Sequence, residues 1–143
     1  MRAFADSSAV VKIYADEVGS DQVRGLDAMY VAEIVRVEVV SAFWRKARMG
    51  DIAPEVCARL VERFEDDLDL EFGPLVAVSI DRDTLKEAAR LAGLHALRAY
   101  DAVQLASALA VRSIDADCQV FVTHDRELLA AAQREGFLPL LDD

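Results

Sequence analysis

The segment RAFADSS, residues 2–8, passes from a short apolar run to a carboxylate and then to two hydroxyl side chains. The apolar run predicts a strand that ends at Asp6. Ser7 and Ser8 predict the start of a helix that continues to about residue 15, because hydroxyl groups satisfy the free N–H groups of a first helical turn. The chain therefore begins with a strand that leads directly into a helix.

The rest of the sequence repeats this alternation of strand-like and helix-like segments. Further strands are predicted at residues 29–31, 75–80, 119–122 and 137–141. Helices are predicted from residue 19 onward and then at residues 33–48, 54–71, 81–94, 101–112 and 125–134. Strands that alternate with helices predict an α/β fold, with a mostly parallel central sheet flanked by helices on both faces.

Residues 33–48 are the one segment whose local signals conflict. Four valines, at positions 35, 37, 39 and 40, favour a strand by propensity. The segment is too long for an ordinary strand, however, and Ile34, Val37, Ser41 and Trp44 recur at helical spacing. We therefore predict a helix, which ends at Gly50.

The composition indicates one folded domain that covers residues 1–143, because 54% of the residues are hydrophobic. No apolar run approaches the roughly 20 residues of a membrane helix, so no membrane association is predicted. Cys57 and Cys118 lack any paired spacing, and we interpret them as reduced thiols of a cytoplasmic protein. The net charge of −10 opposes binding to polyanions and suits a basic partner. A nucleic-acid function would therefore need metal ions and a local basic patch.

Four acidic residues stand at the edges of apolar segments: Asp6, Glu38, Asp101 and Asp125. Asp6 and Asp125 follow predicted strands, and the carboxyl ends of parallel strands are where such folds place their chemistry. Two carboxylates about 4 Å apart repel by roughly 4 kcal/mol at an effective dielectric near 20. A cluster of them therefore needs raised pKa values or bound cations. Oxygen ligands without a Cys/His cluster predict Mg²⁺, or Mn²⁺, rather than Zn²⁺.

Four stretches together resemble the PIN domain, and in particular the VapC toxins of prokaryotic toxin–antitoxin pairs. The first is Asp6 followed by two serines, the second is Glu38 inside an apolar helix, and the third is LRAYDAVQLASA at residues 97–108. VTHDREL at residues 122–128 completes the pattern. The resemblance covers essentially the whole chain, and the stretch around Asp101 is its most specific part.

This resemblance implies a Mg²⁺- or Mn²⁺-dependent endoribonuclease that cleaves cellular RNA and is held inactive by a cognate antitoxin. Homodimers are common among such toxins. The acidic catalytic and metal-binding positions of the family carry over to Asp6, Glu38, Asp101 and Asp125. Two hydroxyl residues that would orient a carboxylate or a water carry over to Ser7 and Thr123. His124 lies outside the family pattern.

Basic residues near these acids are candidates for contact with RNA phosphate. Arg45 lies two helical turns after Glu38 and shares its face, and Arg98 precedes Asp101 by three residues. The alternative for both is a solvated position that complements the helix dipole. Asp115 and Asp117 resemble a small chelating pair, but their polar surroundings predict a solvated loop.

Other classes of protein remain open at this point. A receiver-like signalling domain also combines a parallel sheet with an acidic Mg²⁺ site, although such domains carry adjacent acids after the first strand. A phosphate-handling enzyme of the haloacid-dehalogenase type would need an acid where Ser8 stands. A catalytically silent PIN scaffold would keep the fold and lose the chemistry.

Overall fold

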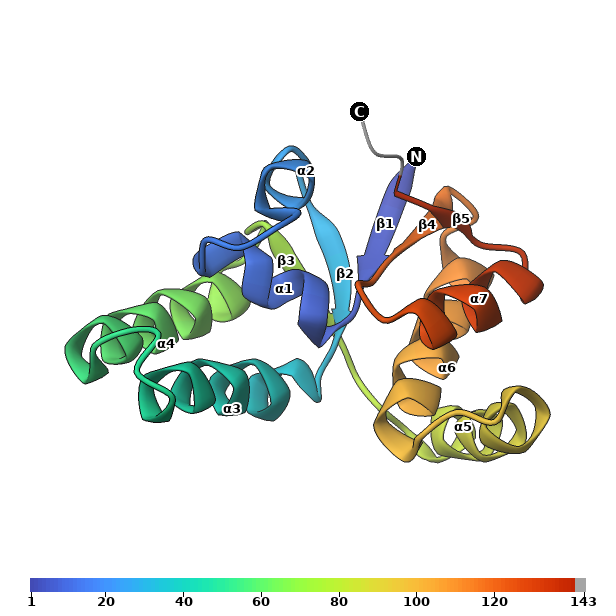
Figure 1. Ribbon diagram of the computed structural model, residues 1–143. Helices are drawn as coiled ribbons and strands as arrows, with labels where there is room; N and C mark the ends of the chain where they lie inside the picture. The colour runs from blue at the N-terminus through green and yellow to red at the C-terminus, as the bar shows by residue number, and fades with distance from the viewer. Residues whose placement is uncertain (141–143) are drawn as a thin grey trace.

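The computed structural model describes residues 1–140, and within them five parallel strands form one central sheet (Figure 1). The strands are β1 (Arg2–Ala5), β2 (Met29–Ala32), β3 (Leu75–Val78), β4 (Cys118–Val122) and β5 (Leu138–Pro139). Their order across the sheet is β3-β2-β1-β4-β5, and every neighbouring pair is parallel. The predicted fold class is confirmed, and the last position of the predicted strand 137–141 lies outside the described residues.

Helices cover both faces of the sheet. They are α1 (Ser7–Tyr14), α2 (Ser20–Arg24), α3 (Val35–Arg48), α4 (Pro54–Asp69), α5 (Arg82–His95), α6 (Ala99–Ile114) and α7 (Arg126–Arg134). In Figure 1, α1 to α4 lie on one side of the sheet and α5 to α7 on the other. The helix α6 begins two residues before the predicted start, so Asp101 lies inside its first turn rather than at its cap.

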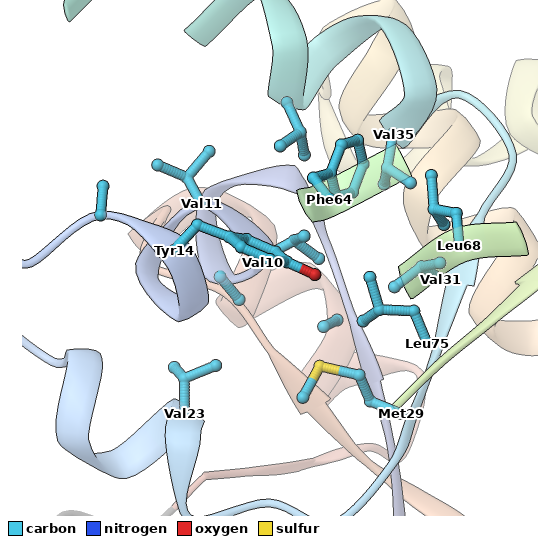
Figure 2. Close-up of a cluster of buried hydrophobic side chains, with 14 of the residues drawn as sticks. Val10, Val11, Tyr14, Val23, Met29, Val31, Val35, Phe64, Leu68 and Leu75 are labelled. Carbon is cyan, nitrogen blue, oxygen red and sulfur yellow. The ribbon is translucent and has the colours of Figure 1, made fainter. Parts of the chain in front are cut away.

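Alternating side chains along the strands divide the interior into two cores. Ala3 and Ala5 of β1 face the core under α1 to α4, whereas Phe4 between them faces the core under α5 to α7. Figure 2 shows part of the first core, where Tyr14 and Phe64 meet edge to face with ring centroids 5.6 Å apart. This period of two is what a sheet that is buried on both faces requires.

The ambiguous valine-rich segment folds as the predicted helix. In α3 the buried side chains are Val35, Val39 and Phe43, which recur every four residues along one face. The helix ends at Arg48, and Gly50 follows with a φ of 81°, a left-handed conformation that glycine adopts without steric cost. Tertiary packing of that face therefore outweighs the strand propensity of the valines.

The strand order creates a crevice at one end of the sheet. β1 lies between β2 and β4, so the chain leaves β1 toward one edge and later returns on its other side. In open parallel sheets, ligands bind beyond the carboxyl ends of the strands at such a reversal. Asp6 directly follows β1, and Thr123 directly follows β4. No helix among residues 1–140 has the length and apolar character that a membrane crossing requires.

Candidate active site

Asp6 lies at the centre of this crevice, and its side chain is held by three donors. The Ser8 hydroxyl donates to Oδ1 over 2.7 Å, and the Ala9 backbone N–H donates to the same oxygen over 3.0 Å. The Thr123 hydroxyl donates to Oδ2. Asp6 thus caps α1, as an isolated aspartate at a strand end often does, and it is also joined to the end of β4.

Burial makes the Asp6 carboxylate unusually easy to protonate. The residue is 4% exposed, and loss of solvent raises its pKa from 3.8 to about 6, although the bonds from Thr123, Ser8 and Ala9 act in the opposite direction. A carboxylate offers about four acceptor positions, and three are filled here. The remaining position is on Oδ2, which accepts one bond in the described structure. Asp6 therefore keeps one lone pair and an uncompensated charge.

Thr123 links the first acid to the last one. Its oxygen accepts the backbone N–H of Asp125 over 3.0 Å while its hydroxyl donates to Asp6. The Asp125 carboxylate in turn accepts the Leu128 N–H over 3.0 Å and caps α7. Thr123 thus joins the ends of β1 and β4 to the start of the last helix.

Glu38 enters the crevice from the first turns of α3. Gln104 of α6 donates its side-chain N–H to Glu38 Oε1 over 2.8 Å. Burial raises the pKa of Glu38, and the negative charges of Asp6 and Asp101 raise it further, whereas hydrogen bonds from Gln104 and Ser7 lower it. Ser7 therefore lowers the pKa of Glu38, and its neighbour Ser8 lowers the pKa of Asp6.

Asp101 lies in the first turn of α6, beside Arg98. Burial raises the pKa of Asp101, the negative charge of Asp125 adds to this, and the positive charge of Arg98 opposes it. The Arg98 guanidinium lies 3.9 Å from Asp101 and 4.0 Å from Asp125, so it stands between the two carboxylates. Its side chain is 84% exposed, which weakens both ion pairs through solvent screening.

The structure places the four predicted acids at the same edge of the sheet. Their charges couple Asp6 to Asp101, Glu38 to both, and Asp101 to Asp125. Within residues 1–140, no three His, Cys, Asp or Glu side chains approach closely enough to form a ready-made metal site. The donor chemistry nevertheless fits Mg²⁺ or Mn²⁺, because these are hard carboxylate oxygens, and the most buried of them, on Asp6 and Glu38, have no cationic partner among the described residues.

A hollow of about 550 Å³ opens beside these acids, between α1, α3 and the start of α6. Glu38 and Arg45 both line it, and so do Ser41 and Tyr100. Arg45 is exposed and makes no ion pair with any residue of the described chain. The neighbouring Lys46 is different, because it pairs with Glu17 over 2.7 Å. Arg45 is thus the cation that shares a hollow with a site carboxylate.

His124 supports the site through its backbone. Its N–H donates to the Ser8 hydroxyl over 3.1 Å, which fixes the oxygen that holds Asp6. Its ring packs against Gly19, where an added Cβ would lie 2.8 Å from His124 Cε1, and the φ of 92° at Gly19 also favours glycine. The imidazole therefore lies toward the start of α2.

The comparisons with known proteins agree with this geometry. The family model described as "PIN domain" matches residues 3–134 of the chain. The chain belongs to the PIN domain family. The same match contains all four acids and both of the predicted hydroxyl residues.

Named relatives of this PIN domain are ribonucleases. The chain is 34% identical over 112 residues to Ribonuclease VapC45 of Mycobacterium tuberculosis, which covers 76% of this chain and 75% of that protein. It is 27% identical over 112 residues to Ribonuclease VapC3 of Pyrobaculum aerophilum, which covers 76% and 82% respectively. The crystal structure of PAE2754 from Pyrobaculum aerophilum superposes with a TM-score of 0.65 at 21% identity, over 98% of this chain and 91% of that one. The last likeness concerns the fold.

The strand order also decides against the receiver-like alternative. Receiver domains have the order 2-1-3-4-5, in which the first strand lies between the second and the third. In this PIN domain β1 lies between β2 and β4. The receiver-like alternative that the sequence left open is therefore excluded, since the crevice is formed by a different pair of strands.

Two polar residues of the site carry roles that the sequence did not reveal. Ser8 holds Asp6 and receives the His124 N–H, and Gln104 holds Glu38. Gln104 is buried, and its Oε1 has no hydrogen-bond partner within the described residues. A buried glutamine in an otherwise apolar helix stretch was the available signal, because such a group needs a polar partner.

Proposed function

We propose that this PIN domain is a metal-dependent endoribonuclease that acts as the toxin of a toxin–antitoxin pair. The observation that carries the proposal is the set of carboxylates at the end of β1. The negative charge of Asp101 raises the pKa of Asp6, and the charges of both raise the pKa of Glu38. Such a cluster reduces the stability of a fold, and it is typical of functional sites. The ribonuclease names of the relatives supply the substrate class.

Asp6, Glu38, Asp101 and Asp125 would hold the cation. Bound there, Mg²⁺ or Mn²⁺ would supply Lewis-acid polarisation of a phosphodiester and an acidified water. Asp6 and Glu38 offer oxygens that donors from the protein already orient, which reduces the conformational entropy lost on binding. Asp125 has one oxygen engaged by the start of α7 and can contribute its other oxygen.

The hydroxyl and amide side chains have a positioning function in this proposal. Ser8 and Thr123 fix both oxygens of Asp6, Ser7 and Gln104 act on Glu38, and none of them carries a charge of its own. Such partners typically contribute about 10- to 100-fold in metal affinity or activity. They hold the acids in one arrangement without neutralising them.

Two arginines would contact the phosphate backbone of the RNA. Arg45 is the stronger candidate because its guanidinium is unpaired in the described chain and lines the hollow next to Glu38. Arg98 would have to exchange Asp101 and Asp125 for a phosphate. Because Arg98 is highly exposed, little free energy is lost with these two ion pairs. Each lost phosphate contact should lower the salt dependence of binding by about 0.7 units for a single strand.

The proposal includes a basic antitoxin that blocks the crevice, and a homodimeric toxin. The net charge of −10 favours a partner of opposite charge. Addition of the purified antitoxin should abolish cleavage at a molar ratio near one, and sedimentation of the free toxin should give about twice the monomer mass. Cleavage that persists with excess antitoxin would contradict the inhibitory pair, and a monomer mass would contradict the homodimer.

The central test is cleavage of total tRNA and ribosomal RNA by the purified chain, freed of any copurifying partner. The reaction is run with Mg²⁺, with Mn²⁺ and with EDTA. Asp101→Asn tests the site, and Asp115→Asn is the matched control, since it removes an acid at the opposite end of the sheet. We expect discrete fragments that disappear with EDTA and with Asp101→Asn and that persist with Asp115→Asn.

Two results would overturn the proposal. Cleavage that is equal in wild type and Asp101→Asn would mean that the activity comes from a contaminant or from another site. Absence of cleavage by folded, partner-free protein with both metals, on both RNA classes, would favour the catalytically silent PIN scaffold.

A further inference from the structure

The hollow beside the acids contains an aromatic ring that the proposed catalytic role leaves unexplained. Tyr100 lines it from the first turn of α6, one residue before Asp101. Tyr100 is 62% exposed, and its hydroxyl makes no hydrogen bond within residues 1–140. An exposed tyrosine without a polar partner, next to a site acid, is available to a ligand.

The opposite wall of the hollow is one continuous face of α3. Its lining residues are Ile34, Val37, Glu38, Ser41, Ala42 and Arg45. These positions follow the i, i+3, i+4 spacing of a single helix face, which runs from an apolar end to a cationic end. Val37 is 69% exposed and lines the same hollow as Tyr100. An aromatic ring, an aliphatic side chain and a cation therefore line one space.

We propose that this hollow binds the nucleotide next to the cleaved phosphodiester, with its base stacked on Tyr100 against Val37 and its neighbouring phosphate on Arg45. The proposal rests on the proposed ribonuclease function and adds a residue that contacts the substrate beside the cut. A volume of about 550 Å³ lies within the range of small-molecule sites and admits one nucleobase with its sugar.

The spacing along α3 determines which phosphate Arg45 contacts. Glu38 and Arg45 are seven residues apart, which is about 10 Å along a helix at 1.5 Å per residue. A phosphate held at Arg45 is therefore a neighbour of the one that is cleaved at the acids. The base between those two phosphates faces Tyr100, so this residue would contact the base beside the cut.

RNA is favoured over a protein segment as the occupant because the hollow is continuous with the acidic crevice through Glu38. When the phosphodiester of an RNA reaches the acids, the adjacent nucleotide lies over this hollow unless the strand turns away from it. Stacking on an aromatic ring accepts every base because each base has a π face, and it contributes about 5- to 150-fold in affinity per base. Arg45 supplies the complementary charge for the phosphate.

The test measures binding of a fluorescein-labelled, single-stranded RNA of mixed sequence by fluorescence anisotropy. Ca²⁺ replaces Mg²⁺, since it binds carboxylates with the same charge but with looser geometry, and a gel verifies that the RNA stays intact. We compare wild type with Tyr100→Ala and Tyr100→Phe. Phe72→Ala is the matched control, because Phe72 is an aromatic residue 97% exposed that does not line the hollow.

We expect Tyr100→Ala to weaken binding at least about tenfold, while Tyr100→Phe and Phe72→Ala stay within about twofold of wild type. The same series is repeated with an RNA that lacks bases but keeps the sugars and phosphates. The loss caused by Tyr100→Ala should disappear with this RNA, because there is no base to stack. A purely structural role for Tyr100 would weaken both RNAs equally.

The outcomes separate this inference from the proposed function. RNA that is cleaved normally and bound equally by wild type and Tyr100→Ala would overturn the inference alone, and so would equal losses for Tyr100→Phe and Tyr100→Ala. Unchanged RNA binding together with weaker antitoxin binding would assign the hollow to a protein segment instead. Failure of wild type to bind or cleave any RNA would overturn both.

Discussion

At the amino ends of the strands, Asp115 receives hydrogen bonds from Arg2 and Tyr30, whereas at the carboxyl ends Asp6 and Glu38 lie among other acids. Arg2 Nη2 donates to Asp115 Oδ1 over 2.8 Å, and the Tyr30 hydroxyl donates to Oδ2 over 2.7 Å. These bonds hold the pKa of Asp115 well below its usual range. Burial and neighbouring charge instead raise the pKa of Asp6 and of Glu38.

The difference separates two uses of an acidic side chain in one sheet. Asp115 joins the starts of β1 and β2 to the loop before β4, and its charge is paired with that of Arg2. Asp6 and Glu38 at the other end are oriented by neutral donors, so their charges remain. The acid that joins the strands is paired with a cation, whereas the two buried acids Asp6 and Glu38 have only neutral partners and keep charges that a cation from solution can neutralise.

The largest expected effect comes from removing charge at the carboxyl end. Asp6→Asn should reduce RNA cleavage by at least about 100-fold, since it removes a ligand rather than one of the partners that orient ligands. The same variant should be more stable than wild type in EDTA at pH 7.5, because the buried charge disappears. Cleavage rates and melting temperatures check the two effects. A variant that loses both activity and stability would show that Asp6 is structural, as Asp115 is.

The pH dependence of stability should differ between the two ends. The pKa of Asp6 rises from 3.8 to about 6 on folding, so between these values the folded chain holds a proton that the unfolded chain has released. Stability should therefore fall as pH rises from about 4 to 6, by up to about 3 kcal/mol. The raised pKa values of Glu38 and Asp101 act in the same direction. The lowered pKa of Asp115 contributes stability that is lost only below about pH 4.

Urea unfolding in EDTA across pH 4–7 measures this slope. Mg²⁺ should raise the unfolding free energy more at pH 7 than at pH 5, because deprotonated acids bind it better. Asp6→Asn should flatten the slope, and Asp115→Asn should leave it unchanged above pH 4. A wild-type stability that rises between pH 4 and 6 would contradict the charge cost at the carboxyl end.

A smaller effect is expected from the neutral donor that orients Glu38. Gln104→Leu keeps the volume of this buried position and removes the hydrogen bond to Glu38 Oε1. The pKa of Glu38 should rise further, and activity should fall about 10- to 100-fold. Added Mg²⁺ should partly restore the rate, since the loss is one of affinity. Ser113→Ala on the exposed side of the same helix is the control, and an unchanged rate for Gln104→Leu would remove Gln104 from the site.

The sequence predicts the acids better than it predicts their partners. Asp6 and Glu38 stand out because each is a charged residue beside apolar residues. The helical spacing of α3 outweighs the strand propensity of its valines because the face of Val35, Val39 and Phe43 packs into the core. Ser8 forms hydrogen bonds with Thr123 and His124, which lie more than 100 residues away in the chain. Such a contact depends on the order of β1 and β4, which local patterns do not encode.

Asp115 illustrates the same limit from the other direction. Its polar loop predicts a solvated carboxylate, and the structure instead pairs it with Arg2 and Tyr30. Arg2 is 113 residues away from it in sequence, and the two meet because β1 and β4 are neighbours. Which charged residues pair at the strand ends depends on the order of the strands in the sheet. That order is seen in the folded chain and not in local sequence patterns.

The smallest expected effect tests the amino end directly. Tyr30→Phe removes the hydroxyl that donates to Asp115 and keeps the ring that packs in the core under α5 to α7. Loss of about 1 kcal/mol should lower the melting temperature by about 2–8 °C, with no change in RNA cleavage or in the pH 4–6 slope. Because Asp115 keeps its pair with Arg2, the loss should be smaller than that of Asp115→Asn. If Tyr30→Phe instead reduced cleavage at full stability, the two ends of the sheet would be coupled. The separation of structural from functional carboxylates would then not hold.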